Sequence, residues 1–199
     1  MALCDLLNLS EDLGKKQGIS EERILEQIDS LRDAFAFYRE YPDMFVEFLC
    51  GENPKNFHLY FYQRCVLRAF MRHRLSYATF PRAFSKSFLA LLTLCLRCIL
   101  YPGAKLFITT GGQAQAAGIA REKVEELCDL IPGLKKEIDW RPGKTLASKD
   151  MVRYLFKNGS ILDVMAGKAT SRGKRKHGRS KYFRLPRTNV IKVIIVILI

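Results

Sequence analysis

The sequence predicts an α/β fold in which a parallel sheet flanked by helices follows an N-terminal helical segment. Two patterns predict it: apolar residues at helical spacing over residues 1–50, and an alternation of strand, helix, strand and helix from Leu75 to Leu130. The chain has 199 residues, 48% of them hydrophobic, which is enough for one ordinary domain with its own core. We expect a helical segment over residues 1–58, an α/β domain over 59–178 and a divergent tail over 179–199.

The N-terminal segment is expected to hold two helices. Ser20, followed by two glutamates, is a suitable N-cap for a helix whose apolar residues run from Ile24 to Phe35. Pro42 interrupts this helix, and Asp43 is expected to cap a short helix after it. A further helix is predicted from about Tyr60 to Arg72, because apolar residues recur on one face.

The next elements carry the α/β prediction. Leu75–Phe80 is a short strand, and a strongly apolar helix is expected from Phe88 to Tyr101. Lys105–Thr110 is predicted as a second strand, and Gln113–Leu130 as an amphipathic helix ended by Pro132-Gly133. Strands that alternate with helices are typical of a parallel sheet.

Two further strand signals follow. Met151–Phe156 and Ser160–Met165 flank Asn158-Gly159, a dipeptide that favours a hairpin turn. The tail Val190–Ile199 is rich in β-branched residues and is predicted as a strand. Its ten residues are too few to cross a membrane, which takes about twenty.

The charge of the chain favours a polyanionic partner. The formal net charge is +13, and the run from Lys168 to Arg187 holds nine Lys or Arg and no acid. We expect this run to contact double-stranded DNA; the alternative is a solvated basic tail. A membrane-surface protein is the weakest interpretation, because it rests only on the basic run beside the apolar tail. The residues expected to bind DNA are Lys168, Arg172, Lys174, Arg175, Lys176 and Arg179.

The six cysteines are scattered through apolar helical stretches. Cys95 and Cys98 form a CxxC inside an apolar helix without a second pair, so helix packing is favoured over zinc or redox chemistry. The first ten residues lack the basic region of a signal peptide, and we expect reduced thiols in a cytoplasmic protein.

The segment from Leu75 to Tyr101 has the order of parts that binds a nucleoside triphosphate. Such a site needs backbone N–H groups aimed at the phosphates, a cation near the β and γ phosphates, and a hydroxyl for Mg²⁺. A strand, a tight loop, Lys86, Ser87 and a helix supply these parts in that order. The loop is irregular, because Phe80 and Ser85 stand where the usual motif has glycines. The sequence therefore predicts a P-loop NTPase-like fold that binds a nucleoside triphosphate with Mg²⁺; the resemblance described next implies that the triphosphate is ATP.

The loop Pro81–Ser87 resembles the altered phosphate loop of phage terminase large subunits, the motors that package DNA into proheads. In that family an arginine lies four residues before the lysine, as Arg82 does here. Gln63, 23 residues before Lys86, is similar to the glutamine that reads adenine in these motors. Ile108–Gln115 resembles the second strand and the start of its helix. The hairpin at Asn158-Gly159-Ser160, followed by Ser171-Arg172-Gly173, resembles the stretch before the Walker B strand.

The resemblance covers about residues 35–178 and implies the ATPase part of a motor for ATP-dependent DNA packaging. It implies that Gln63, Arg82, Ser85 and Lys86 contact the nucleotide and that the Ser87 hydroxyl binds Mg²⁺. The partners it implies are double-stranded DNA, the terminase small subunit, the portal and further copies of the chain in a ring. The resemblance implies no contact with a membrane, and it implies a location in the cytoplasm of the host cell. On the residues alone, Gln63 is equally well a solvated helix residue.

The chain departs from the family after Gly178. The family continues with an apolar strand that ends in Asp-Glu, whereas the last acid here is Asp163 and the apolar tail has none. We therefore expect a truncated motor with an incomplete sheet, no identified catalytic residue, weak nucleotide binding and negligible turnover. Two alternatives are another P-loop DNA translocase or helicase, and a non-catalytic basic protein that binds nucleic acid through phosphate contacts.

Overall fold

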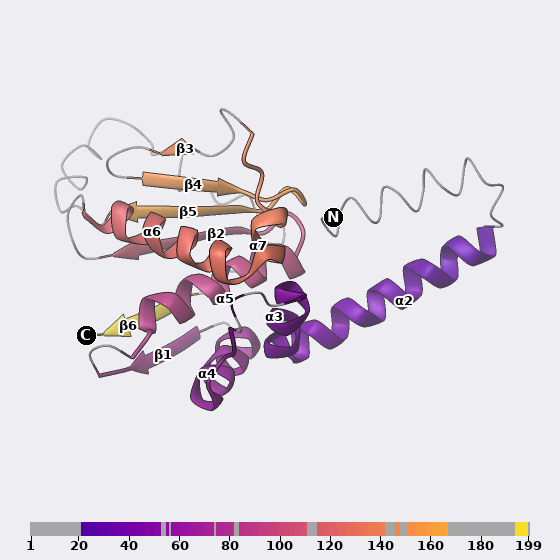
Figure 1. Ribbon diagram of the computed structural model, residues 1–199, viewed down its shortest axis with the longest axis horizontal. Coiled ribbons are helices and arrows are strands. Elements are labelled where there is room, and N and C mark those ends of the chain that lie inside the picture. Colours follow the sequence, from indigo (N-terminus) through magenta and orange to yellow (C-terminus); the bar gives the residue numbers. More distant parts are fainter. Residues whose placement is uncertain are drawn as a thin grey trace.

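The chain has a mixed α/β fold with helices in front of and below a sheet (Figure 1). The structure is a computed structural model. It describes residues 21–52, 55, 57–73, 75–81, 84–110, 115–141, 146–147, 151–166 and 194–198. Within these residues one hydrophobic core joins the helices to the sheet, and Phe45, Leu96 and Leu162 are among its fully buried members.

Three helices come first: α2 (Glu21–Glu40), α3 (Pro42–Cys50) and α4 (Phe61–Arg72). Pro42 separates α2 from α3 as predicted, and it occupies the first turn of α3, where its missing N–H costs nothing. The expectation that Asp43 caps α3 is wrong, since no side chain caps this helix. The Asp43 side chain is only 1% exposed and accepts hydrogen bonds from Arg68 Nε (2.7 Å) and Nη2 (2.8 Å).

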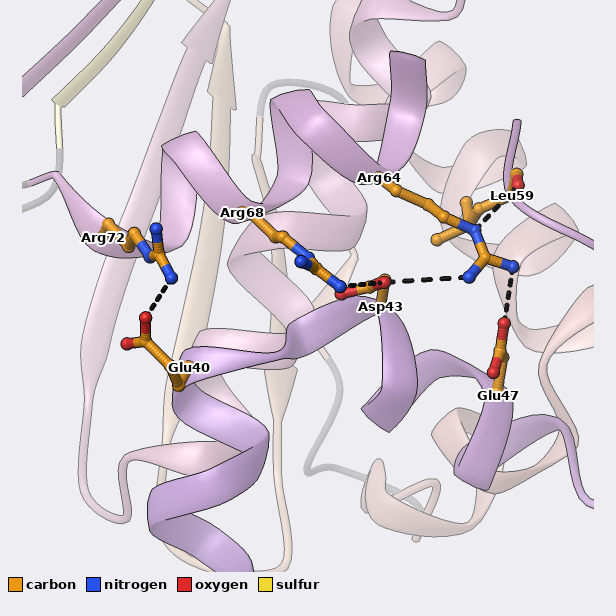
Figure 2. Close-up of polar contacts among 7 residues, drawn as sticks. All are labelled: Glu40, Asp43, Glu47, Leu59, Arg64, Arg68 and Arg72. Carbon is orange, nitrogen blue, oxygen red and sulfur yellow. Dashed lines mark hydrogen bonds and ion pairs between the residues drawn. The ribbon is translucent and has the colours of Figure 1, made fainter. Parts of the chain in front are cut away.

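Arginines at every fourth position of α4 tie it to α2 and α3 (Figure 2). This spacing puts Arg64, Arg68 and Arg72 on one face, which we call the arginine ladder. Their partners are Asp43 and Glu47 for Arg64 (3.7 and 2.5 Å), Asp43 for Arg68, and Glu40 for Arg72. Burial by itself raises the pKa of Asp43, but the Arg68 hydrogen bonds and the charges of Arg68 and Arg64 outweigh it and lower that pKa.

Helix α5 (Lys86–Leu100) is the centre of the fold and follows β1 (Leu75–Thr79). Every side chain from Leu89 to Leu100 is buried, as expected of a helix that is apolar on all sides. Cys95 and Cys98 are buried within it, so the prediction that they pack in a helix is confirmed. The buried Arg97 donates from Nη2 to the carbonyls of Phe70 and Met71, both at 2.7 Å. These bonds hold the C-terminus of α4 against α5.

The larger sheet contains β2 (Lys105–Thr110), β3 (Leu146–Ala147), β4 (Met151–Leu155) and β5 (Ile161–Ala166) in the order β2-β5-β4-β3. β2 and β5 are parallel, whereas the β5–β4 and β4–β3 pairs are antiparallel. The predicted hairpin at Asn158-Gly159 is confirmed, with Gly159 at φ 80°. Asn158 Nδ2 also donates to the carbonyls of Cys98 (2.7 Å) and Ile99 (3.0 Å), which fixes the hairpin to the end of α5.

The two strands of the α/β prediction do not share a sheet. β1 pairs in parallel with β6 (Ile194–Leu198), with Leu75 opposite Ile194, so the strand predicted in the apolar tail is confirmed. The prediction of one parallel sheet is wrong for the described strands, because β2 pairs with β5 instead of β1 and the larger sheet is mixed. An alternation of strands and helices determines the order of elements but not which strands pair.

Two helices cover the larger sheet, α6 (Gln115–Leu130) and α7 (Pro132–Glu137) (Figure 1). Pro132 was expected only to end α6, but it also begins α7, for which its fixed φ is suited. A Cβ added to Gly133 would lie 2.5 Å from the carbonyl oxygen of Leu49, so a glycine is needed where α7 crosses α3. None of the described helices combines the length and the hydropathy needed to cross a membrane.

Candidate functional site

A cavity of about 660 Å³ lies at the N-terminal end of α5, within the usual size range for small-molecule sites. Three parts of the chain line it: the segment that leads into α4, the loop that begins α5, and one side of α6. The lining residues are Lys55, Phe57, His58, Tyr60, Gln63, Phe84, Ser85, Lys86, Ser87, Phe88, Lys123, Glu126 and Leu130.

The residue directly before α5 has an unusual backbone conformation. Ser85 has φ 49° and ψ 25°, and it is the only described non-glycine residue with a positive φ. This left-handed conformation costs a residue with a Cβ about 1–2 kcal/mol, which explains why glycine usually stands at this position. The carbonyl of Ser85 accepts a hydrogen bond from Leu89 N (2.9 Å), so α5 begins directly after it. Lys86 and Ser87 are therefore the first two residues of a buried helix.

This helix start is suited to binding an anion. The first N–H groups of an α-helix have no partner within the helix, and the helix dipole places partial positive charge there. Lys86, half-buried, and Ser87, exposed, both line the cavity and add an ammonium and a hydroxyl. Arg82, the other predicted phosphate ligand, lies outside the described residues, as do Lys168, Arg172, Lys174, Arg175, Lys176 and Arg179.

Gln63 comes to the same cavity from α4. Its side chain is buried, with 5% of the residue exposed, so the alternative of a solvated helix residue is wrong. Its Oε1 accepts a hydrogen bond from Tyr60 N (2.9 Å), which stabilises the start of α4. No hydrogen bond from its amide nitrogen to another described residue accompanies this cap. The expectation that Gln63 contacts the nucleotide stays a prediction, and its role at the start of α4 was not predicted from the sequence.

Aromatic rings form a continuous row beside the loop. Ring centroids lie 6.1 Å apart for Tyr60 and Tyr62, 4.3 Å for Tyr62 and Phe84, and 5.7 Å for Phe84 and Phe80. We call these four residues the aromatic row. Tyr60 and Phe84 line the cavity, and Tyr60 is 69% exposed. The row therefore presents flat apolar faces, against which a planar ring can stack.

Helix α6 contributes two charged side chains that the sequence did not single out. Lys123 Nζ lies 2.5 Å from Glu126 Oε2, and the two side chains are 41% and 45% exposed. An ion pair at i,i+3 is common on the surface of any amphipathic helix, so no sequence pattern marks these two residues as functional. Only the fold shows that they face the start of α5.

The described lining of the cavity offers few oxygen ligands for a metal ion. Ser87 lines the cavity with a hydroxyl and Glu126 with a carboxylate, and no group of three or more His, Cys, Asp or Glu side chains that could hold a metal occurs among the described residues. Mg²⁺ commonly keeps several waters and takes its remaining ligands from substrate phosphates. The cavity thus suits an anion with an attached cation better than a metal bound by protein alone.

Comparison with protein-family models and with curated proteins finds no match to this chain. The resemblance to terminase large subunits therefore stays a prediction based on the sequence. The lining of the cavity combines a helix start with Lys86 and Ser87 on one side and Gln63 with aromatic rings on another.

Proposed function

We propose that this chain binds ATP with Mg²⁺ in the cavity at the start of α5, as the ATPase part of a DNA-packaging motor of the terminase type. One observation carries the binding proposal. The left-handed Ser85 starts a buried helix whose first residues, Lys86 and Ser87, line a cavity of about 660 Å³. A cavity of this size has room for a nucleotide.

The triphosphate would lie against the N-terminus of α5. Its oxygens would accept hydrogen bonds from the first backbone N–H groups of the helix, and Lys86 would contact the β and γ phosphates. The Ser87 hydroxyl would hold Mg²⁺, which would neutralise part of the phosphate charge. In this arrangement the helix and the cation both stabilise the charge of the ligand.

The base would lie at the aromatic side of the cavity. Tyr60 and Phe84 offer ring faces for stacking, and the Gln63 amide nitrogen is a hydrogen-bond donor for a ring nitrogen of adenine. Because the Gln63 oxygen already holds Tyr60 N, base recognition and the start of α4 depend on the same side chain.

The wider part of the proposal rests on the sequence. Double-stranded DNA is the proposed partner of the basic run 168–187, and the small subunit, the portal and a ring of copies follow from the resemblance. Glu126 is the one carboxylate among the described lining residues. Since rapid hydrolysis needs carboxylates that hold the metal and orient water, we expect binding with little turnover.

A second candidate function is nucleic-acid binding without catalysis. The nine basic residues between Lys168 and Arg187, with no acid among them, favour it. Binding of this kind depends on phosphates, so its affinity for duplex DNA would fall steeply with salt and would be lost on deletion of residues 168–199. If this were the function, the chain would not bind ATP, and ATP would not change its affinity for DNA.

Isothermal titration calorimetry with ATP and Mg²⁺ tests the binding proposal. Lys86→Ala removes a charge-assisted hydrogen bond, so the Kd for ATP should rise about tenfold or more. Lys136→Ala is the matched control, because Lys136 is an exposed lysine on α7 that does not line the cavity. Absence of ATP binding in the wild-type chain, or equal affinity in the two variants, would refute the proposal.

A further inference from the structure

Helix α6 carries two ion pairs, one on each side of its buried stripe. At about 100° per residue, Lys123 and Glu126 lie on one side of the stripe formed by Val124, Leu127 and Cys128, and Arg121 and Glu125 lie on the other. Only the Lys123–Glu126 pair lines the cavity. Helix α6 therefore provides a charged pair at the site and a comparable pair outside it.

From this placement we infer that Lys123 is a second phosphate-binding cation, which exchanges its partner Glu126 for the triphosphate when a nucleotide binds. This inference rests on the proposed function, because it adds a ligand to the same site. Lys86 approaches the cavity from α5 and Lys123 from α6, so the two ammonium groups belong to different elements. A triphosphate between them would be held from two sides.

The Lys123–Glu126 pair is suited to such an exchange. Both side chains are more than two fifths exposed, and ion pairs at this exposure contribute little to stability. A triphosphate carries several negative charges and makes stronger charge-assisted hydrogen bonds than a single solvated carboxylate. Lys123 therefore gains more from the phosphate than it loses from Glu126.

Glu126 then has a defined effect on affinity. With no nucleotide bound, Glu126 neutralises the charge of Lys123 and places a negative charge in the cavity that we propose binds the triphosphate. With a nucleotide bound, its charge lies near phosphates of the same sign. Glu126 thus weakens binding, and it favours release of the nucleotide.

Titration of the full chain with ATP, AMP and inorganic tripolyphosphate tests the inference. Lys123→Ala should raise the Kd for ATP and for tripolyphosphate about fivefold or more and leave AMP nearly unchanged, whereas Lys123→Arg should retain affinity. Glu126→Gln should bind ATP about threefold or more tightly. Measured against Lys123→Ala, the gain from Glu126→Gln should be smaller in the double variant Lys123→Ala/Glu126→Gln, because only the direct repulsion between Glu126 and the phosphates is then relieved.

The second ion pair of α6 supplies the controls. Arg121→Ala and Glu125→Gln remove the same kinds of charge from the same helix outside the cavity, so their ATP affinities should stay close to that of the wild type. If Lys86→Ala loses binding while Lys123→Ala and Glu126→Gln match these controls, the inference is overturned and the proposed function stands. If the wild type does not bind ATP, or Lys86→Ala binds it equally well, both are overturned.

Discussion

Removal of Arg68 should destabilise the chain far more than removal of its neighbour on the arginine ladder. Arg68→Ala deletes the two hydrogen bonds of 2.7 and 2.8 Å to Asp43, a carboxylate that is 1% exposed. Loss of one partner of a fully buried pair costs about 3–5 kcal/mol. Here the Arg68 side chain is 38% exposed and Arg64 stays 3.7 Å from the carboxylate. Water and Arg64 reduce the penalty, and we expect about 2–3 kcal/mol.

Urea denaturation followed by far-UV circular dichroism measures this loss. In a thermal unfolding experiment on a chain of this size, a loss of about 2–3 kcal/mol in the free energy of unfolding lowers Tm by roughly 4–12 °C. Arg72→Ala is the matched control one turn further along α4, because Arg72 and Glu40 are both about half exposed and should contribute about 0.5 kcal/mol or less. Equal losses for Arg68→Ala and Arg72→Ala would refute the role given to the buried carboxylate.

The same contact predicts the sign of a pH effect. The pKa of Asp43 is lowered in the folded state, so its charge stabilises the fold at pH values above its ordinary pKa of 3.8. This contribution is lost as the pH falls through the lower, folded-state pKa. The stability gap between wild type and Asp43→Asn should therefore be full at about pH 7 and narrow toward about pH 3. A gap that stays constant over this range would show that the charge of Asp43 is not involved.

Two further predictions follow from packing and burial. Gly133→Ala should cost about 1–3 kcal/mol in urea denaturation, because the new methyl group meets the backbone of Leu49; an unchanged midpoint would show that α7 moves freely on α3. Burial raises the pKa of Cys95, and burial together with nearby acids raises the pKa of Cys128 to about 12. At pH 8 these two thiols are therefore protonated and should react with a disulfide reagent only after the chain unfolds. The exposed Cys65 should react with the reagent while the chain is folded, which gives a fast phase in the reaction time course. The fast phase that Cys65 contributes should be absent from Cys65→Ser.

Local signals were sufficient for most individual elements. The predicted strand Lys105–Thr110 coincides with β2, and the Asn158-Gly159 turn joins β4 to β5 as expected. Both depend on near neighbours: alternation within a strand, and a dipeptide that tolerates a positive φ. Strand partners were not predictable in the same way. β1 finds its partner in the tail, more than one hundred residues away, and no local pattern encodes that choice.

The candidate site shows the same division between local and long-range information. Lys86, Ser87 and Gln63 were predicted because a motif and its spacing connect them, and the fold brings all three to one cavity. Lys123 and Glu126 reach that cavity only because α6 packs beside α5, and the sequence marks them as an ordinary surface pair. Asp43 was misread for a related reason. Its position next to a helix start suggests a cap, but the arginines that hold it come from a later helix.

The arrangement of α4 and α5 connects the cavity to contacts at the far end of both helices. Their N-terminal ends meet at the cavity, where Gln63 and Lys86 lie, and Arg97 of α5 holds the carbonyls of Phe70 and Met71 at the C-terminal end of α4. The two helices therefore run in the same direction, with β1 returning the chain between them. Because the arginine ladder fixes the outer face of α4 to α2 and α3, the position of Gln63 relative to Lys86 depends on contacts along the whole length of α4.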